Sequence, residues 1–345
     1  MLCGRFEMKV FVTGGSGYIG SVVVRRLLER GDSVTVFDNL ERGHRANLET
    51  ADGYGRRKPV CPLVVGDLRN DDEILAAMRE VRPEAVVHFA AYALVGESMR
   101  NPQMYFDSNI RGGSNLLAAM ADVGCDRIVF SSSCATYGVP DELPIEETMP
   151  QHPTNPYGYS KLVFEQMATW LQRQRGLKPT FLRYFNAAGA VPELGLGEDH
   201  EPETHIIPNV LKVALGQKEF VEVFGTDYPT ADGTCVRDYV HLEDLCSAHL
   251  LALDTGAVGA FNLGTGKGAS VLEIVEACRK VTGHPIPVRL SPRRPGDPPA
   301  LYASGSKARR ELGWNPTHSD VETIVRDAWA FHQAHPEGVE PTGVL

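Results

Sequence analysis

The sequence contains no long apolar segment and no recognisable leader. Its longest apolar stretch, Ala85–Val95, contains His88 and is shorter than the roughly 20 residues that a helix needs to cross a bilayer. The first seven residues carry charge but no apolar core, so we expect neither a signal peptide nor a membrane partner. Hydrophobic residues make up 43% of the chain and are spread along it, as is typical of a globular protein.

Closely spaced cysteine pairs and excess positive charge are also absent. The seven cysteines are dispersed and form no C-x-x-C pair, so we expect buried thiols in a reducing cytoplasm rather than a disulfide framework or a metal site. The formal net charge is −10, which argues against a nucleic acid as the partner. The short basic run at 56–58 is therefore interpreted as a solvated loop.

Glycine, by contrast, is concentrated directly after an apolar run. Residues 10–20 read VFVTGGSGYIG, and Gly14, Gly17 and Gly20 are each three positions apart. A helical pattern follows over 21–30, so the order is strand, glycine turn, helix. Glycine permits the tight turn and the close approach of a pyrophosphate, and the helix start offers N–H groups to its oxygens. An ordinary strand–helix turn would look similar.

A second strand makes the dinucleotide interpretation the stronger one. Residues 34–37 are apolar and β-branched, and they end in Asp38, at about the 20-residue offset of a ribose-binding carboxylate. A carboxylate there accepts hydrogen bonds from the ribose 2′-hydroxyl and repels a 2′-phosphate. The pattern therefore predicts NAD rather than NADP as the cofactor.

Strand and helix patterns then alternate along the chain. Strands are predicted at 60–65, 85–91 and 127–130, with helices at 71–81 and 102–121. This alternation predicts an α/β fold with a doubly wound parallel sheet of Rossmann type, whose ligand lies beyond the carboxyl ends of the strands. The residues expected to converge there are Gly14, Asp38, Asp67, Phe89 and Ser133.

The composition and the pattern of elements change near residue 186, where the chain becomes rich in loops and acidic residues. We therefore predict a Rossmann domain over 1–185 that binds NAD. A smaller α/β substrate-binding lobe is predicted over 186–345, with the segment near 236–262 returning to the first domain.

A candidate catalytic set lies in the segment NPYGYSK. Tyr157 and Lys161 are four residues apart and share one face of a predicted helix, while Ser133 ends a strand 24 residues upstream. Serine can position the oxygen of a carbinol, and tyrosine can serve as acid and base. An ammonium at about 4 Å is worth up to roughly 4 kcal/mol at an effective dielectric of 20, so we expect Lys161 to lower the pKa of Tyr157. The alternative is an ordinary helix-surface pair.

Taken together, these motifs resemble the extended short-chain dehydrogenase/reductase family, and most closely its UDP-sugar 4-epimerases. The resemblance runs through nearly all of residues 8–331. It is carried by TGGSGYIGS, FDNLERGHR, GDLRN, VVHFAA, SSSCATYG, NPYGYSK, LRYFNAAGA, GTCVRDYVH and RRPGD. The resemblance implies an isomerase that inverts C4 of a UDP-hexose such as UDP-glucose or UDP-galactose through a transient 4-keto sugar, with NAD held throughout.

The resemblance also implies residue roles. Tyr157 would take the proton of the sugar 4-hydroxyl, Ser133 would bond that oxygen, and Lys161 would bind the nicotinamide ribose. The implied cofactor contacts are Gly14, Gly17, Tyr18, Ile19, Gly20, Asp38, Asn39, Asp67, Leu68, Phe89, Ala90, Ala91, Asn109, Tyr157, Lys161 and Tyr184. The implied substrate contacts are Ser133, Tyr157, Asn186, His205, Arg237, Arg294, Asp297 and Leu301. Family members pair through two helices, here about 102–121 and 157–175, so a homodimer is expected.

Two departures from the family pattern bear on the reaction. Cys134 and Ala135 stand where sugar dehydratases have an acidic pair, which disfavours dehydration. Leu301 is intermediate in size at the position that resembles the gate for N-acetylated sugars. Epimerases of UDP-N-acetylhexosamines, pentoses or uronates remain alternatives, as does a non-catalytic dinucleotide sensor.

Overall fold

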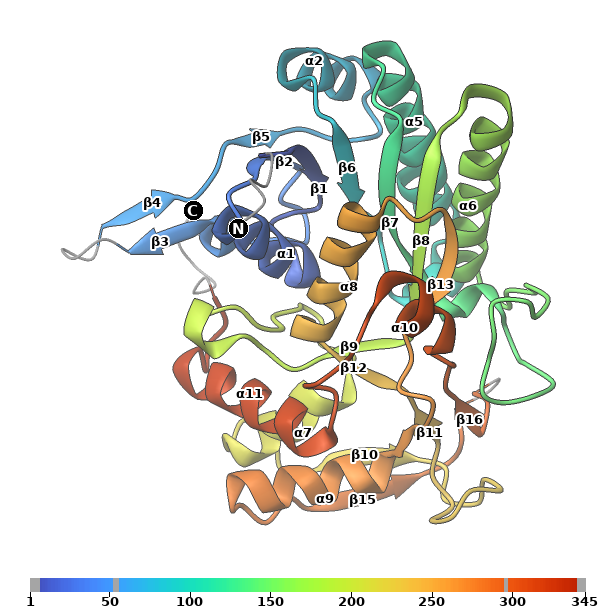
Figure 1. The fold of residues 1–345 in the computed structure, drawn as a ribbon. Coiled ribbons are helices and arrows are strands. Elements are labelled where there is room, and N and C mark those ends of the chain that lie inside the picture. Colours follow the sequence, from blue (N-terminus) through green and yellow to red (C-terminus); the bar gives the residue numbers. More distant parts are fainter. Residues whose placement is uncertain (1–6, 52–55, 295–296, 340–345) are drawn as a thin grey trace. The chain divides into compact units, whose positions relative to one another are not determined.

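The computed structural model describes residues 7–51, 56–294 and 297–339, and the ribbon is drawn in Figure 1. The chain divides into two compact units. The first contains residues up to 138, 150–183 and 248–261, and the second contains 139–149, 184–247 and the chain from 262 onward. Residues 248–261 thus return to the first unit, whereas 236–247 belong to the second. The assignment of 139–149 to the second unit differs from the predicted boundary at 185.

The first unit is built on a seven-stranded sheet. Its strands are β1 (Lys9–Thr13), β2 (Ser33–Asp38), β5 (Leu63–Val65), β6 (Ala85–His88), β7 (Arg127–Ser133), β8 (Lys178–Tyr184) and β13 (Gly259–Asn262). Their order across the sheet is β13-β8-β7-β6-β1-β2-β5. The pairs β2–β5, β1–β2, β1–β6 and β6–β7 are all parallel. The order reverses at β1, which confirms the predicted doubly wound Rossmann-type sheet and marks its carboxyl edge as the place for a ligand.

Helices cover the sheet of the first unit. They are α1 (Tyr18–Glu29), α2 (Asp71–Val81), α3 (Val95–Arg100), α4 (Pro102–Tyr105), α5 (Gly112–Val123) and α6 (Pro156–Arg175). Short 3₁₀ turns occupy Arg45–Leu48 and Cys134–Thr136, and the hairpin β3 (Glu49–Ala51)–β4 (Arg57–Pro59) projects from the same unit. Apolar residues of α2, α5 and α6, including Met78, Leu116 and Phe164, pack with strand residues in one buried cluster. This core includes Phe164 of α6 and Phe130 of β7.

Two features of these helices concern the site. Helix α6 begins where Asn155 caps it by accepting from the N–H of Gly158 at 2.8 Å and ends at Gly176 in the left-handed conformation. The helical segment predicted over 102–121 is found over 102–123, with Phe106–Arg111 in π-helical geometry between α4 and α5. Such turns are frequent at functional sites.

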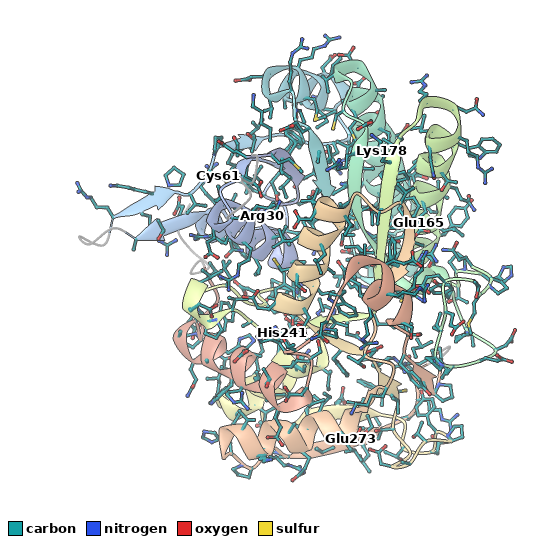
Figure 2. All side chains as sticks on the ribbon, in the orientation of Figure 1. Arg30, Cys61, Glu165, Lys178, His241 and Glu273 are labelled. Atoms are coloured by element: carbon teal, nitrogen blue, oxygen red, sulfur yellow. The ribbon has the colours of Figure 1, made fainter. Side chains whose placement is uncertain are left out.

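The second unit consists of small sheets and helices. The strand pairs are β10 (Val221–Phe224) with β15 (Val288–Ser291), and β9 (Asn186–Ala188) with β12 (Tyr239–His241); β11 (Val236–Arg237) lies between β14 (Ala269–Ser270) and β16 (Ala300–Leu301). The helices are the 3₁₀ turn Pro192–Leu194, α7 (Ile206–Ala214), α9 (Val271–Thr282), α10 (Ser306–Leu312) and α11 (Val321–Ala334). Glu273, labelled in Figure 2, completes a capping box with Ser270 at the start of α9. Helix α8 (Leu242–Thr255) starts in this unit and ends in the first.

Helices α7, α9 and α11 pack together around the apolar core of the second unit, which includes Val210, Ile274 and Ile324. This arrangement agrees with the predicted smaller α/β lobe. Within the described residues, none of the helices combines the length and apolarity needed to cross a membrane.

Candidate active site

The glycine turn after β1 forms a cradle for a phosphate group. Gly14 has φ +73°, and a Cβ added there would lie 2.5 Å from the backbone nitrogen of Ala90. A Cβ at Gly20 would lie 2.3 Å from the Gly14 carbonyl oxygen. A Cβ at Gly17 would meet only that same oxygen, at 3.4 Å. The outer side of the turn is therefore uncovered where α1 begins, so a pyrophosphate can approach the helix N-terminus.

Asp38 is fixed at the end of β2 beside this cradle. Its carboxylate accepts from the N–H groups of Ser16 at 3.0 Å and Leu40 at 2.9 Å, and the residue is 7% exposed. A carboxylate has about four acceptor positions, so two remain for ribose hydroxyls. The observed geometry fits the predicted role in binding the adenosine ribose of NAD.

Two further predicted cofactor residues lie together at the same sheet edge. Asn39 donates to the carboxylate of Asp67 at 3.0 Å, and Arg69 pairs with that carboxylate at 2.6 Å. The hydrogen bond from Arg69 is the main cause that lowers the pKa of Asp67 to about 2. Asp67 therefore stays ionised at neutral pH.

The turn after β6 is held by backbone bonds and by Asn109. The N–H groups of Phe89 and Ala90 both donate to the Thr13 carbonyl, at 2.9 and 3.1 Å. In the π-helical turn, the amide of Asn109 bonds both backbone groups of Tyr92 and donates to Ser160 Oγ at 2.9 Å. Asn109 thus joins this turn to α6, and its predicted contact with the cofactor stays a prediction.

Three consecutive serines at the end of β7 bond one face of α6. The Ser131 carbonyl accepts from Lys161 Nζ at 2.8 Å, and Ser133 hydrogen-bonds the Tyr157 phenol. Lys161 is 4% exposed. Its ammonium lies 5.9 Å from the Tyr157 ring centroid and 4.7 Å from that of Phe130. The predicted Ser133, Tyr157 and Lys161 are therefore brought together.

The electrostatics of this set differ from the prediction. Burial raises the pKa of Tyr157, and the hydrogen bond from Ser133 offsets this only in part. Burial also lowers the pKa of Lys161 to about 7, while Glu165 acts in the opposite direction. The expected lowering of the Tyr157 pKa by Lys161 is thus not found. Removal from water dominates the pKa of each group.

A buried ion pair below the catalytic set escaped the sequence analysis. Glu165, labelled on α6 in Figure 2, accepts from Ser132 Oγ at 2.5 Å and from Arg183 Nε at 2.9 Å. Arg183 also donates to the Tyr137 hydroxyl at 2.6 Å. Glu165 and Arg183 are 3% and 5% exposed. The sequence position of Glu165 could have indicated this residue, because it lies four residues beyond Lys161 on the same helix face.

The second unit gathers several of the predicted substrate residues. Arg237 pairs with Asp297, and on the neighbouring strand Leu301 lies opposite Arg237 in register. Arg294 lies over the Phe224 ring, with its guanidinium carbon 4.1 Å from the centroid. Of the RRPGD motif, Pro295 and Gly296 lie outside the described residues.

The remaining predicted residues of this unit have separate surroundings. The Asn186 amide donates to the Asp238 carbonyl at 2.9 Å, in the β9–β12 pair. His205 is hydrogen-bonded to Glu198. Tyr184, predicted to contact the cofactor, is buried at the end of β8.

A doubly wound sheet with a glycine cradle and a serine–tyrosine–lysine set at the end of β7 defines a dinucleotide-binding enzyme of Rossmann type. The model of the NAD dependent epimerase/dehydratase family matches residues 10–264, and the chain belongs to this family. The predicted resemblance is thereby confirmed.

Individual proteins similar to the chain have more specific names than the family. The chain is 49% identical over 335 residues to the UDP-glucose 4-epimerase of Halalkalibacterium halodurans. The alignment covers 96% of this chain and 97% of the relative. It is also similar to the crystal structure of UDP-glucose 4-epimerase from Bifidobacterium longum in complex with NAD⁺ and UDP, with TM-score 0.89, 39% identity and coverage of 96% and 99%. For the UDP-Glc/GlcNAc 4-epimerase of Campylobacter jejuni, the TM-score is 0.82, the identity 37% and the coverage 95% and 99%.

Proposed function

We propose that the protein catalyses the NAD-dependent 4-epimerisation of a UDP-hexose and interconverts UDP-glucose and UDP-galactose. The observation that carries this function is the Ser133–Tyr157–Lys161 set, buried at the carboxyl edge of a sheet that also presents a glycine cradle and Asp38. Relatives named UDP-glucose 4-epimerase that align over 96% of the chain support the same reaction.

The residues of the chain perform the proton chemistry. Bound NAD would supply the acceptor for the C4 hydride and its return, so no net oxidation occurs. Tyr157 accepts the proton of the 4-hydroxyl, and Ser133 donates a hydrogen bond to the same oxygen as the keto sugar forms. Lys161 is proposed to bind the nicotinamide ribose, and at a pKa of about 7 both forms of Lys161 are populated at neutral pH.

The second unit supplies groups for the UDP part of the substrate. Arg237 and Arg294 each carry a planar guanidinium, which suits bidentate bonds to diphosphate oxygens. Asp297 orients Arg237 by their ion pair and is proposed to accept from the uridine ribose. Asn186 and His205 complete the proposed contacts to the sugar diphosphate.

The main alternative substrate is a UDP-N-acetylhexosamine, because the relative from Campylobacter jejuni is described as a UDP-Glc/GlcNAc 4-epimerase. Leu301, paired with Arg237 across β11 and β16, is the residue proposed to decide between the two. Its side chain is larger than glycine or serine and smaller than tyrosine, so we expect UDP-glucose to be the better substrate.

The direct test is the substitution Tyr157→Phe, which removes the hydroxyl and retains the ring. UDP-galactose is incubated with purified protein, and the UDP-glucose formed is measured by chromatography. We expect turnover to fall by about 10²–10⁴-fold, the range for loss of a general acid–base. Turnover at the wild-type rate would refute the assignment of Tyr157. A product lighter by one water would instead indicate a dehydratase.

The proposal includes a cytoplasmic homodimer. Six described cysteines are free and buried, which suits a reducing compartment. On α6, Met167 and Leu171 pack against the core, whereas Trp170 is 61% exposed and available for an intersubunit helix contact. Light scattering of the purified protein tests the dimer, for which we expect twice the chain mass of 37.7 kDa.

A further inference from the structure

Four potential metal ligands lie on one short segment of the second unit, between the turn at Pro192–Leu194 and α7. They are Glu198, His200, Glu203 and His205, and their ligand atoms all lie within 4.8 Å of one another. We propose that these four residues bind one divalent ion of the first transition row, with Zn²⁺ the ion of best fit. The sequence analysis, which relied on cysteine spacing, expected no metal.

The spacing of the donors matches a metal coordination sphere. Zn²⁺ is bound at about 2.0–2.2 Å by imidazole nitrogen and carboxylate oxygen, so neighbouring donors of a tetrahedral site lie roughly 3.4 Å apart. His200 Nδ1 is 3.2 Å from Glu198 Oε1, and His205 Nδ1 is 3.8 Å from Glu203 Oε1. His205 Nδ1 is also bonded to Glu198. Small side-chain rotations would therefore place all four donors around one ion.

Burial and charge favour a cation at this point. The side chains of Glu198 and Glu203 are 5% and 3% exposed, and two buried carboxylates this close need a compensating positive charge. Without an ion, that charge comes from His200 and His205, which bond Glu198. A divalent ion would neutralise both carboxylates. The side chains of His200 and His205 are 29% and 43% exposed, so an ion can enter from their side.

The backbone holds this segment in place at both ends. The amide of Asn209, on the first turns of α7, donates to the carbonyl of His205 at 2.7 Å and to that of Glu203 at 3.3 Å. At the other end, a Cβ added at Gly197 would lie 2.3 Å from the Phe331 ring, so the chain is pressed against α11. The four ligands are thus positioned by the fold rather than by the ion alone.

The donor types select the class of ion. Two imidazoles with two carboxylates suit Zn²⁺ and other first-row ions, whereas Mg²⁺ and Ca²⁺ prefer oxygen ligands alone. An ion on Nδ1 of His205 would leave Nε2 as an N–H donor, the form that hydrogen-bonds a phosphate oxygen. This last consequence rests on the proposed function, but binding of the ion does not.

The test measures binding of Zn²⁺ and Co²⁺ to the full-length, untagged protein with its cofactor. Protein treated with a chelator is titrated with Zn²⁺ by calorimetry and with Co²⁺ by visible absorption. We expect one ion per chain and a Co²⁺ spectrum of nitrogen and oxygen ligands without thiolate charge-transfer bands. Thiolate bands, or no bound ion, would overturn the proposal.

Variants locate the ion. His200→Ala and Glu203→Gln are each expected to weaken binding by at least ~10-fold, since even outer-shell partners of metal ligands are worth 10–100-fold. His284→Ala, which removes an exposed histidine of the same unit, is expected to bind as the wild type does. Binding by both cluster variants with wild-type affinity would place the ion elsewhere and refute the assignment. Circular dichroism confirms that each variant is folded. The absorption spectrum of Co²⁺ bound to the wild type identifies the ligand atoms without use of the variants.

Discussion

Lys161 should lower the stability of the fold at neutral pH, and replacing it should make the protein more stable. Its ammonium is 4% exposed and has one described hydrogen bond, to the Ser131 carbonyl at 2.8 Å. Burial lowers its pKa from 10.5 to about 7. In the substitution Lys161→Met, an apolar side chain of similar length takes the place of the buried charge.

The size of the effect follows from the two pKa values. A lowering from 10.5 to about 7 corresponds to roughly 4–5 kcal/mol at 1.36 kcal/mol per unit. Loss of the bond to Ser131 leaves a buried carbonyl unsatisfied and costs about 1–3 kcal/mol. We therefore expect the free energy of unfolding of Lys161→Met to exceed that of the wild type by about 1–4 kcal/mol at neutral pH.

The pH dependence has a definite sign. Between pH 7 and 10.5 the unfolded chain binds a proton at Lys161 more readily than the folded chain does, since the folded-state pKa is the lower one. The stability of the wild type therefore rises with pH in this window, relative to the variant. The penalty is complete below about pH 7 and vanishes above about pH 10.5. From about pH 7.5 to 9.5, the gap should close by about 2–3 kcal/mol.

Urea unfolding of both proteins across this pH range measures the gap. Bound NAD adds RT ln(1 + [L]/Kd) to the free energy of unfolding. Titrations at two NAD concentrations therefore separate a change in cofactor affinity from a change in the stability of the fold itself. Lys178→Met is the control, because this lysine, labelled in Figure 2, is half exposed and pairs with Asp126 at the surface. Its loss should change stability by less than about 1 kcal/mol. A gap between Lys161→Met and wild type that stays constant or widens with pH would refute the reasoning.

Three further results are expected. Wild-type protein should convert UDP-N-acetylglucosamine at least ~10-fold more slowly than UDP-glucose, since a misfit at Leu301 is worth about 10–200-fold; equal rates, or preference for the acetylated sugar, would contradict the size argument. Glu165→Gln should lower the free energy of unfolding by about 3–5 kcal/mol in urea titrations, because it leaves Arg183 buried without its carboxylate partner; a loss below 1 kcal/mol would contradict this. Gly20→Ala should lose bound NAD as measured by absorbance, since its Cβ would lie 2.3 Å from a carbonyl oxygen of the turn. Gly96→Ala, whose Cβ would have no neighbour closer than 3.8 Å, should retain NAD.

The sheet and its cofactor edge could be predicted because their signals are local. The strands predicted at 34–37, 60–65, 85–91 and 127–130 are short apolar runs, and the glycine spacing at 14–20 specifies the turn after the first strand. Strand β8, which reads KPTFLRY, was not predicted. The π-helical geometry of Phe106–Arg111 was not predicted, and Asn109 within it bonds Tyr92 and Ser160, which are distant in sequence. Likewise, residues 139–149 join the second unit through backbone bonds of Ile145 to Tyr302 and Ser304. No periodicity of the sequence indicates such contacts.

The proximity of Ser133, Tyr157 and Lys161 could be predicted, but their electrostatics could not. The spacing of Tyr157 and Lys161 specifies that they share a helix face. The pKa values depend on how much water each group retains, and this is set by the packing of α6 against β7. Coulomb's law applied to Tyr157 and Lys161 alone leaves out the desolvation of both side chains. It therefore gave the wrong direction for Tyr157.

The face of α6 that bears Tyr157, Lys161 and Glu165 explains how these opposing effects are balanced. Burial alone would drive Lys161 to its neutral form, whereas the Glu165 carboxylate raises the pKa of Lys161. Glu165 can remain charged at 3% exposure because Arg183 and Ser132 bond it. A pKa of about 7 for Lys161 is thus the result of two strong and opposite effects. A general acid–base set works best when its pKa values lie near the working pH, and the buried ion pair of Glu165 and Arg183 is part of the arrangement that keeps the pKa of Lys161 there.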